Sequence, residues 1–474
     1  MPGQESFWAY GGDFGPPGVP SDDNFCHNGI VQADRSPTPQ VPEFKKAYQY
    51  IQVQAQALNE AGGSFTFKNW FDFMNPKQVF EGSFTLTADA KVIARGALPP
   101  LDLGYRDSRT IPLSWKAIVP EPGVEYFVNF SFKLANDTPW ARAGFPLAWE
   151  QFKLPVQAPR RETAMKGTVT TRSDDAAVYV DGKDFSLTFR KNDAALHSFV
   201  FAGLELMKAP LLPHFWRAPT DNDRGFDMAT ALGVWSGNTM KAHSVAAERV
   251  HHGAVRVVTQ ATLKEVPARL VIRYDVYPSA DVHVKFTMEP LPQAVPVAVP
   301  MMPRVGMQMA LAPGFDLLRW FGRGPHETYS DRKDAPVGMY SGSVASQYFN
   351  YAEPGETGNK TDVRWAALIH DKGVGLLAAA TTSLLNVNAL PFTTADLQSV
   401  KHGWELPRRN FTTLNIDHRQ MGLGGENSWG ARPLPPHVLP FDRYEYSFRL
   451  RPFHTKSDDP LQLSREALPV VAPL

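Results

Sequence analysis

Two pairs of carboxyl groups stand at spacings that could serve acid–base chemistry. Asp221 and Asp223 form the first pair, and Glu327 and Asp331 form the second. Two carboxyl groups that flank a glycosidic bond, one as acid and the other as nucleophile or base, can hydrolyse that bond. Acidic residues in turns also accept hydrogen bonds from backbone amides or pair with neighbouring arginines. The sequence favours this structural role, because spacing alone does not pair any two of these carboxyl groups.

A tryptophan, Trp429, ends a run of glycine and polar residues that spans 424–428. Its ring could stack on the apolar face of a sugar while Glu426 and Asn427 reach the hydroxyl groups, since aromatic sites with polar rims commonly bind ligands. The ring could equally cap one end of a β-sandwich. The sequence leaves both interpretations open.

Histidine and tyrosine side chains offer a third chemistry. His326, Tyr329 and His418 could act as the base of an epimerase or lyase, although the sequence gives no geometry between a base and its partner. Adjacent His251 and His252 would point to opposite faces of a strand, so they do not indicate a metal site. We find no phosphate loop, dinucleotide-binding glycine motif or nucleophile elbow in a fitting context.

The composition excludes several classes of protein. The 474 residues include 48 Lys and Arg against 48 Asp and Glu, so nothing favours binding to nucleic acid or to a membrane surface. Cys26 is the single cysteine, which rules out an intrachain disulfide and fits a reducing compartment. The first residues lack the pattern of a secretory signal, and no apolar run is long enough to span a bilayer. We therefore expect a cytoplasmic location.

The elements that must position these residues are mostly strands. Residues 43–48 after Pro42 predict one early helix. Apolar residues alternate with polar ones along 124–134, interrupted by Phe127, and about 100 residues of such pattern predict an immunoglobulin-like sandwich over 56–155.

A second region of strands follows a linker at residues 155–165. Asp181-Gly182 indicates a tight hairpin turn, and the runs 270–276 and 282–288 predict a meander. The pattern continues to about residue 453, which is too long for a small sandwich. We expect a large two-sheet sandwich over 165–455 and a C-terminal tail over 456–474.

Five separated blocks, in order, resemble the β-galactosidases of glycoside hydrolase family 2. They are WAYGGDFG at 8–15 with NFCHNGIV at 24–31 and ADRSP at 33–37, then AG at 143–144 with AWEQF at 148–152, FWRAPTDND at 215–223, WFGRGPHETYSDR at 320–332, and MGLGGENSW at 421–429. The first block is similar to the last strand and closing loop of that family's (β/α)₈ barrel. The resemblance therefore implies a mainly β chain in which the end of a barrel, residues 1–55, precedes an immunoglobulin-like sandwich and a large supersandwich.

This resemblance also implies a function and its limits. The chain would be the C-terminal portion of a retaining enzyme that hydrolyses terminal β-D-galactosyl residues, as in lactose, with the catalytic glutamates and Mg²⁺ ligands in a missing N-terminal part. Phe25 and Asn28 match positions at a bound Na⁺ beside the sugar, and Trp429 matches a tryptophan that forms a platform for the sugar. No catalytic residue is expected within the chain. The expected partners are a galactoside, an N-terminal β-galactosidase chain or fragment, and further copies in an oligomer.

Two other interpretations remain open. Large sandwiches can bind sugars without cleaving them, so the chain could be a non-catalytic carbohydrate-binding or scaffold protein. The second interpretation is that the chain is a different enzyme, which uses its own histidine or tyrosine as a base. Sugar binding without hydrolysis would favour the scaffold.

Overall fold

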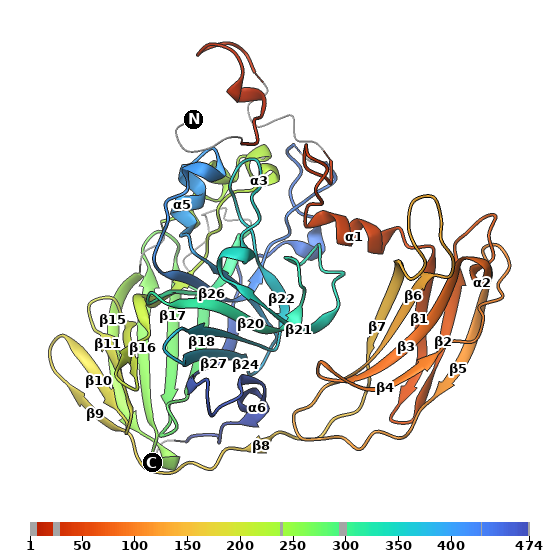
Figure 1. Ribbon diagram of the computed structural model, residues 1–474. Coiled ribbons are helices and arrows are strands. Elements are labelled where there is room, and N and C mark those ends of the chain that lie inside the picture. Colours follow the sequence, from red (N-terminus) through yellow and green to blue (C-terminus); the bar gives the residue numbers. More distant parts are fainter. Residues whose placement is uncertain (1–6, 22–28, 238–239, 293–300, 428, 473–474) are drawn as a thin grey trace.

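The computed structural model describes residues 7–21, 29–237, 240–292, 301–427 and 429–472, and the fold is mainly β. Figure 1 shows a smaller sandwich joined by an extended linker to a larger one, with the N-terminal segment at one end of the larger. Among the described residues, no helix is long and apolar enough to cross a membrane.

The smaller sandwich contains the predicted alternating strand. Within the described residues a three-stranded sheet, in the order β1-β2-β5, faces a four-stranded sheet, in the order β4-β3-β6-β7. Phenylalanines from both sheets fill the space between them, and the ring centroids of Phe65 and Phe130 lie 4.8 Å apart. The strands are β1 Ile51–Asn59, β2 Gly62–Asn69, β3 Phe80–Ala88, β4 Lys91–Ala97, β5 Ser108–Ser114, β6 Tyr126–Leu134 and β7 Pro146–Lys153, with the short helix α2 Pro76–Val79 before β3.

A nine-stranded antiparallel sheet forms one layer of the larger sandwich in the described part of the chain. Its central strand is β27, the last long strand of the sequence, which pairs with β18 on one side and β24 on the other. In spatial order the strands are β15 Met240–Arg249, β16 Val255–Leu263, β17 Ala268–Val276, β18 Val282–Pro290, β27 Tyr444–His454, β24 Val374–Ala380, β23 Trp365–His370, β20 Phe315–Arg323 and β21 Val337–Ser343.

The second layer is a ten-stranded sheet, again counted over the described residues. Large apolar side chains such as Trp235, Phe286 and Met307 fill the core between the layers. In spatial order the strands are β22 Lys360–Val363, β25 Leu385–Leu390, β26 Thr412–Gln420, β19 Arg304–Leu311, β14 Met207–His214, β12 Ala195–Phe201, β11 Phe185–Arg190, β10 Ala177–Asp181 and β9 Thr170–Ser173, with β13 Leu204–Glu205 beside β12.

Two local predictions have different outcomes. The meander of β17 and β18 is confirmed, because Val276 pairs with Val282 across the turn. The hairpin of β10 and β11 forms, but its turn is not at Asp181-Gly182 as expected. The amide of Gly182 donates to the carbonyl of Phe185 at 2.9 Å, so Gly182 belongs to the ladder and residues 183–184 make the turn.

The interrupting phenylalanine of β6 explains how the two sandwiches meet. Phe127 lies on the outward face of its sheet, where it packs against Phe321 and Trp365 of the larger sandwich. The carboxylate of Glu125 accepts from Arg364 at 2.6 Å beside this cluster. The apolar residue on this polar face therefore indicates an interface with the other sandwich. It does not interrupt the strand.

The segment before the smaller sandwich connects both sandwiches. Helix α1, Gln40–Ala47, confirms the predicted early helix and lies between them in Figure 1. Its Lys46 pairs with Glu150 of β7 at 2.6 Å, and its Glu43 accepts from the amide of Asp334 at 2.9 Å. The described residues from 7 to 50 contain one 3₁₀ turn, η1 Gly11–Asp13, and no strand, because a barrel strand needs neighbours to form a ladder.

Candidate functional site

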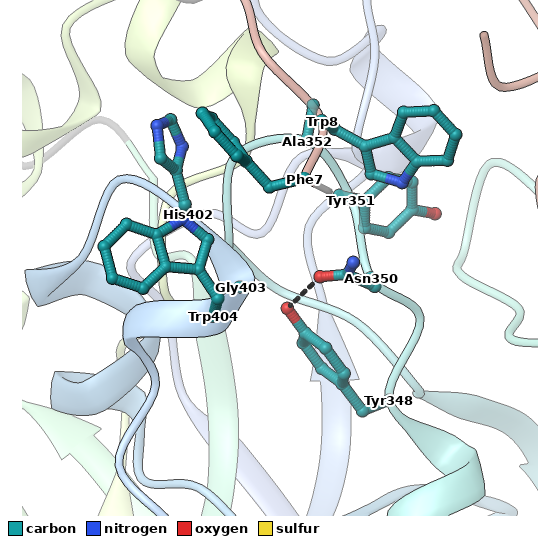
Figure 2. Close-up of a pocket in the computed structure, with 9 residues that line it drawn as sticks. All are labelled: Phe7, Trp8, Tyr348, Asn350, Tyr351, Ala352, His402, Gly403 and Trp404. Atoms are coloured by element: carbon teal, nitrogen blue, oxygen red, sulfur yellow. Dashed lines mark hydrogen bonds between the residues drawn. The ribbon is translucent and has the colours of Figure 1, made fainter. Parts of the chain in front are cut away.

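A pocket of about 420 Å³ lies where the N-terminal segment meets two loops of the larger sandwich (Figure 2). Its lining is rich in aromatic rings with a few polar groups: Phe7, Trp8, Tyr348, Asn350, Tyr351, Ala352, His402, Gly403 and Trp404. Pockets of this size and character bind small molecules. The sequence singled out Trp8 within its first block but gave no sign that the two loops would join it.

Polar and aromatic contacts hold the N-terminal segment on these loops. The hydroxyl of Tyr10 donates to the carbonyl of Lys401 at 3.1 Å, and the carboxylate of Asp13 lies 2.8 Å from Nε2 of His402. The ring of Phe7 stands 5.2 Å from the same imidazole. His402 precedes η5, Gly403–Glu405, and follows α5, Thr394–Ser399, so these short elements set the rim of the pocket.

A buried carboxylate, Glu327, lies behind the pocket. It accepts from the hydroxyl of Tyr351 at 2.6 Å, from Thr357 at 2.9 Å, from the amide of Gly358 at 2.6 Å and from Arg332. Burial would raise the pKa of Glu327, but the charge of Arg332 and these hydrogen bonds outweigh it and hold the pKa below its ordinary value. A carboxylate with this many hydrogen-bond donors is a fixed anion that anchors the 351–358 loop. It does not serve as a proton donor.

The other predicted acids also hold a loop in place. Asp223 accepts two hydrogen bonds from Arg217, at 2.9 and 2.8 Å, and Arg217 is fully buried. Arg217 then donates to the carbonyls of Met421 and Gly422, each at 2.9 Å. From the other side, Asp331 accepts from the amides of Leu423 and Gly424 at 2.7 and 3.0 Å. The structural role of these acids, which the sequence favoured, is therefore the one observed.

The loop held in this way presents Trp429. Short helix α3, Asp221–Gly225, lies against it: a side chain at Gly225 would come within 2.8 Å of the backbone carbonyl carbon of Trp429. The indole of Trp429 is 73% exposed and does not line the pocket of Figure 2. Residues from three of the five sequence blocks, at 215–223, 320–332 and 421–429, thus form the loop with the exposed aromatic ring and the contacts that hold it.

The remaining sequence-based sites have mixed outcomes. Phe25 and Asn28 lie outside the described residues, which contain no cluster of three or more metal-ligating side chains. Asn427 accepts from the amides of Trp429 and Ala431, both at 3.1 Å, so it shapes the loop.

Of the three possible bases, Tyr329 is fully buried, and His326 and His418 are partly buried. Burial lowers the pKa of both His326 and His418 to about 4, and burial raises the pKa of Tyr329 well above its ordinary value. None of the three lines the pocket of Figure 2. The described geometry therefore does not favour an epimerase or lyase built on them.

Replacing Asp331 with alanine should loosen the loop that carries Trp429. Two partly buried backbone amides would lose their acceptor, at a cost of about 0.5–1.5 kcal/mol for each hydrogen bond. We expect lower thermal stability and faster hydrogen exchange at Leu423 and Gly424. Asp334→Ala is the matched control, because that side chain is exposed. Equal exchange at the two amides in both variants would contradict the assignment.

Three sequence families match consecutive parts of the chain. The family described as "Beta galactosidase small chain" matches residues 181–450, "Beta-galactosidase, domain 4" matches 65–155, and "Glycosyl hydrolases family 2, TIM barrel domain" matches 2–53. The first of these alone covers more than half of the chain.

Curated relatives agree with these matches. A β-galactosidase of Priestia megaterium is 32% identical over 94% of this chain and 43% of its own length. That of Halalkalibacterium halodurans is 28% identical over 93% and 42%, and that of Lactobacillus delbrueckii subsp. bulgaricus is 31% identical over 91% and 41%. The chain therefore spans about two fifths of the length of these relatives.

Proposed function

We propose that this chain supplies the sugar platform and scaffold of a β-galactosidase, because it belongs to the β-galactosidases of glycoside hydrolase family 2. The reaction is hydrolysis of terminal β-D-galactosyl residues with retention, by two glutamates about 5–5.5 Å apart. These glutamates lie in a barrel portion that residues 1–474 do not supply.

The observation that carries the proposal is the exposed indole of Trp429 on a loop with anchored ends. An exposed aromatic ring with polar neighbours can stack on the apolar face of a ligand. Buried Arg217 and partly buried Asp331 fix the backbone at the start of this loop from two sides. The loop therefore presents the ring from a fixed base, where it can stack on the apolar face of a galactosyl unit.

Metal ions and location complete the proposal. Asn28 through its amide oxygen and Phe25 through its carbonyl would bind Na⁺ beside the sugar, since hard cations prefer oxygen ligands. Mg²⁺ ligands would lie in the barrel portion. The partners would be a galactoside, an N-terminal β-galactosidase chain or fragment, and further copies in an oligomer. The single cysteine, Cys26, supports a cytoplasmic location.

Trp429→Ala should weaken substrate binding in the enzyme reconstituted with an N-terminal β-galactosidase fragment. We expect KM for a chromogenic β-galactoside to rise about tenfold or more, since stacking on an aromatic ring contributes on the order of 1–3 kcal/mol. Trp429→Phe, which keeps a ring, should retain most of the affinity. Steady-state kinetics of both variants give the answer.

The control for this experiment is Trp140→Ala. Trp140 is also exposed, at 65%, but belongs to the smaller sandwich, so its loss should leave KM unchanged. A Trp429→Ala variant with unchanged KM and lower thermal stability would show that the ring caps the sandwich and binds no sugar.

A further inference from the structure

A transverse row of polar side chains crosses the outer face of the nine-stranded sheet, away from the pocket of Figure 2. Arg256 pairs with Asp275, Asp275 with His283, His283 with Arg449, and Arg449 with Ala379. Residues directly opposite on antiparallel strands point to the same face of the sheet. Their neighbours along the strands point into the core instead, namely Val257, Tyr274, Val284 and Phe448.

The C-terminal segment covers this row and leaves a cavity of about 340 Å³ beneath it. The hydroxyl of Tyr277 donates to the carbonyl of Pro469 at 2.9 Å, and Arg256 donates to that of Val471 at 3.0 Å. Strand β28, Glu466–Ala467, pairs in parallel with β8, Arg161–Glu162, of the linker. Arg160 directly precedes β8 and lines the same cavity.

Two arginines at the cavity have donors without acceptors among the described residues. Arg449 is 3% exposed; it donates to Asp281 through Nε and to the carbonyl of Leu463 through Nη1, but its Nη2 has no hydrogen-bond acceptor. That nitrogen forms an ion pair with Glu466 at 3.7 Å, a distance too long for a hydrogen bond. Arg160 is exposed to solvent and lines the cavity, and it forms no ion pair or side-chain hydrogen bond within the part of the chain that the structure describes. A buried donor without an acceptor, such as Nη2 of Arg449, is uncommon, because it costs free energy on folding.

The charged groups at the cavity leave Arg160 as the cation without a paired carboxylate among the described residues. Arg273 and Arg449 line the cavity with Asp275 and Glu466, and Arg449 is also paired with Asp281 beside it. Asp275 is already engaged, with Arg256 at 2.7 Å and Arg273 at 3.2 Å. Partial desolvation at the cavity lowers the pKa of Arg160, Glu125 opposes that shift, and the like charge of Arg449 adds to it. An anion between Arg160 and Arg449 would relieve that repulsion.

We propose that this cavity binds a small divalent oxyanion of the phosphate or sulfate class, held between Arg160 and Nη2 of Arg449. Guanidinium groups match the tetrahedral oxygens of such an ion by paired, charge-assisted hydrogen bonds. The cavity is large enough for an ion or a small phosphate ester but too small for a large ligand. The site would link the C-terminal segment, the linker and the sheet.

Isothermal titration of the full chain with inorganic phosphate tests the proposal, with sodium chloride at equal ionic strength as the blank. We expect saturable binding at one site per chain and competition by sulfate. Arg160→Gln should weaken binding about tenfold or more, because one charge-assisted hydrogen bond contributes on the order of 1.5–3 kcal/mol. Glycerol 3-phosphate, titrated in parallel, identifies an organic phosphate as the ligand if it binds more tightly, and the free ion if it does not bind.

Arg161→Gln is the matched control, because it is the next residue of the linker, is exposed and does not line the cavity. Arg160 makes no described contact that folding needs, so the melting temperature of Arg160→Gln without phosphate should equal that of the wild-type chain. Phosphate heats no larger than those of chloride would overturn the proposal. Equal weakening by both substitutions would overturn it too, since the attraction would then be a general effect of charge. Neither result depends on galactosidase activity.

Discussion

The purified chain should leave a chromogenic β-galactoside intact, and addition of an N-terminal β-galactosidase fragment should start its hydrolysis. The four acids that the sequence singled out are not available for this chemistry. Glu327 accepts hydrogen bonds from four donors, Asp223 is paired with buried Arg217, Asp331 binds two backbone amides, and Asp221 pairs with Arg224. We therefore expect the chain alone to give no more than the uncatalysed rate, and the mixture to exceed it by roughly six orders of magnitude or more.

The fragment alone is the control in this assay, and one from the Priestia megaterium relative is a suitable choice because that enzyme is 32% identical to this chain. Hydrolysis by residues 1–474 alone would show that carboxylates within them catalyse the reaction. A mixture that binds galactoside without cleaving it would favour the non-catalytic sugar-binding scaffold.

Replacing Glu327 with alanine should destabilise the larger sandwich by about 3–5 kcal/mol, the cost of removing one partner from a buried ion pair. Arg332 would keep its charge in a buried site, and Thr357 and the amide of Gly358 would lose their acceptor. Urea unfolding followed by tryptophan fluorescence measures the change. Glu265→Ala serves as the control, because Glu265 is exposed on the same sandwich. A loss no greater than that of the control would contradict the anchoring role.

The same carboxylate gives the wild-type chain a defined acid sensitivity. Its pKa in the folded state lies below the ordinary value of 4.5, so its contribution is complete above pH 4.5 and is lost as the pH falls through the folded-state pKa. Glu327→Gln should remove that part of the pH dependence.

The sequence predicted the strand pattern well because burial imposes it locally. The alternation of 126–134, the meander of β17 and β18 and the helix after Pro42 follow from periodicities of two and 3.6 residues. Phe127 broke the pattern because it packs against the larger sandwich. One of its contacts there is Phe321, about 190 residues away in the sequence. No local signal carries that information.

The candidate site was predicted less completely for the same reason. Trp429 was found from its own neighbours, but the contacts that position it come from Arg217, Asp223 and Asp331, which lie 98 to 212 residues earlier in the chain. The aromatic pocket joins Trp8 to Trp404. Turn propensity and motif spacing do not extend over such separations, so only the folded chain shows these residues together.

The place of β27 in its sheet has a consequence for synthesis on the ribosome. This strand, made last, lies between β18 and β24 and joins two halves of four strands each in the described residues. At translation speeds of roughly 5–20 residues per second, the growing chain spends on the order of ten seconds with β18 complete and β27 not yet made. During that interval β18 presents an open edge, and β24 presents another once it has been made, and both can pair with other nascent chains. The nine-stranded sheet is therefore completed only when β27 emerges, and chaperones that shield strand edges should increase its yield.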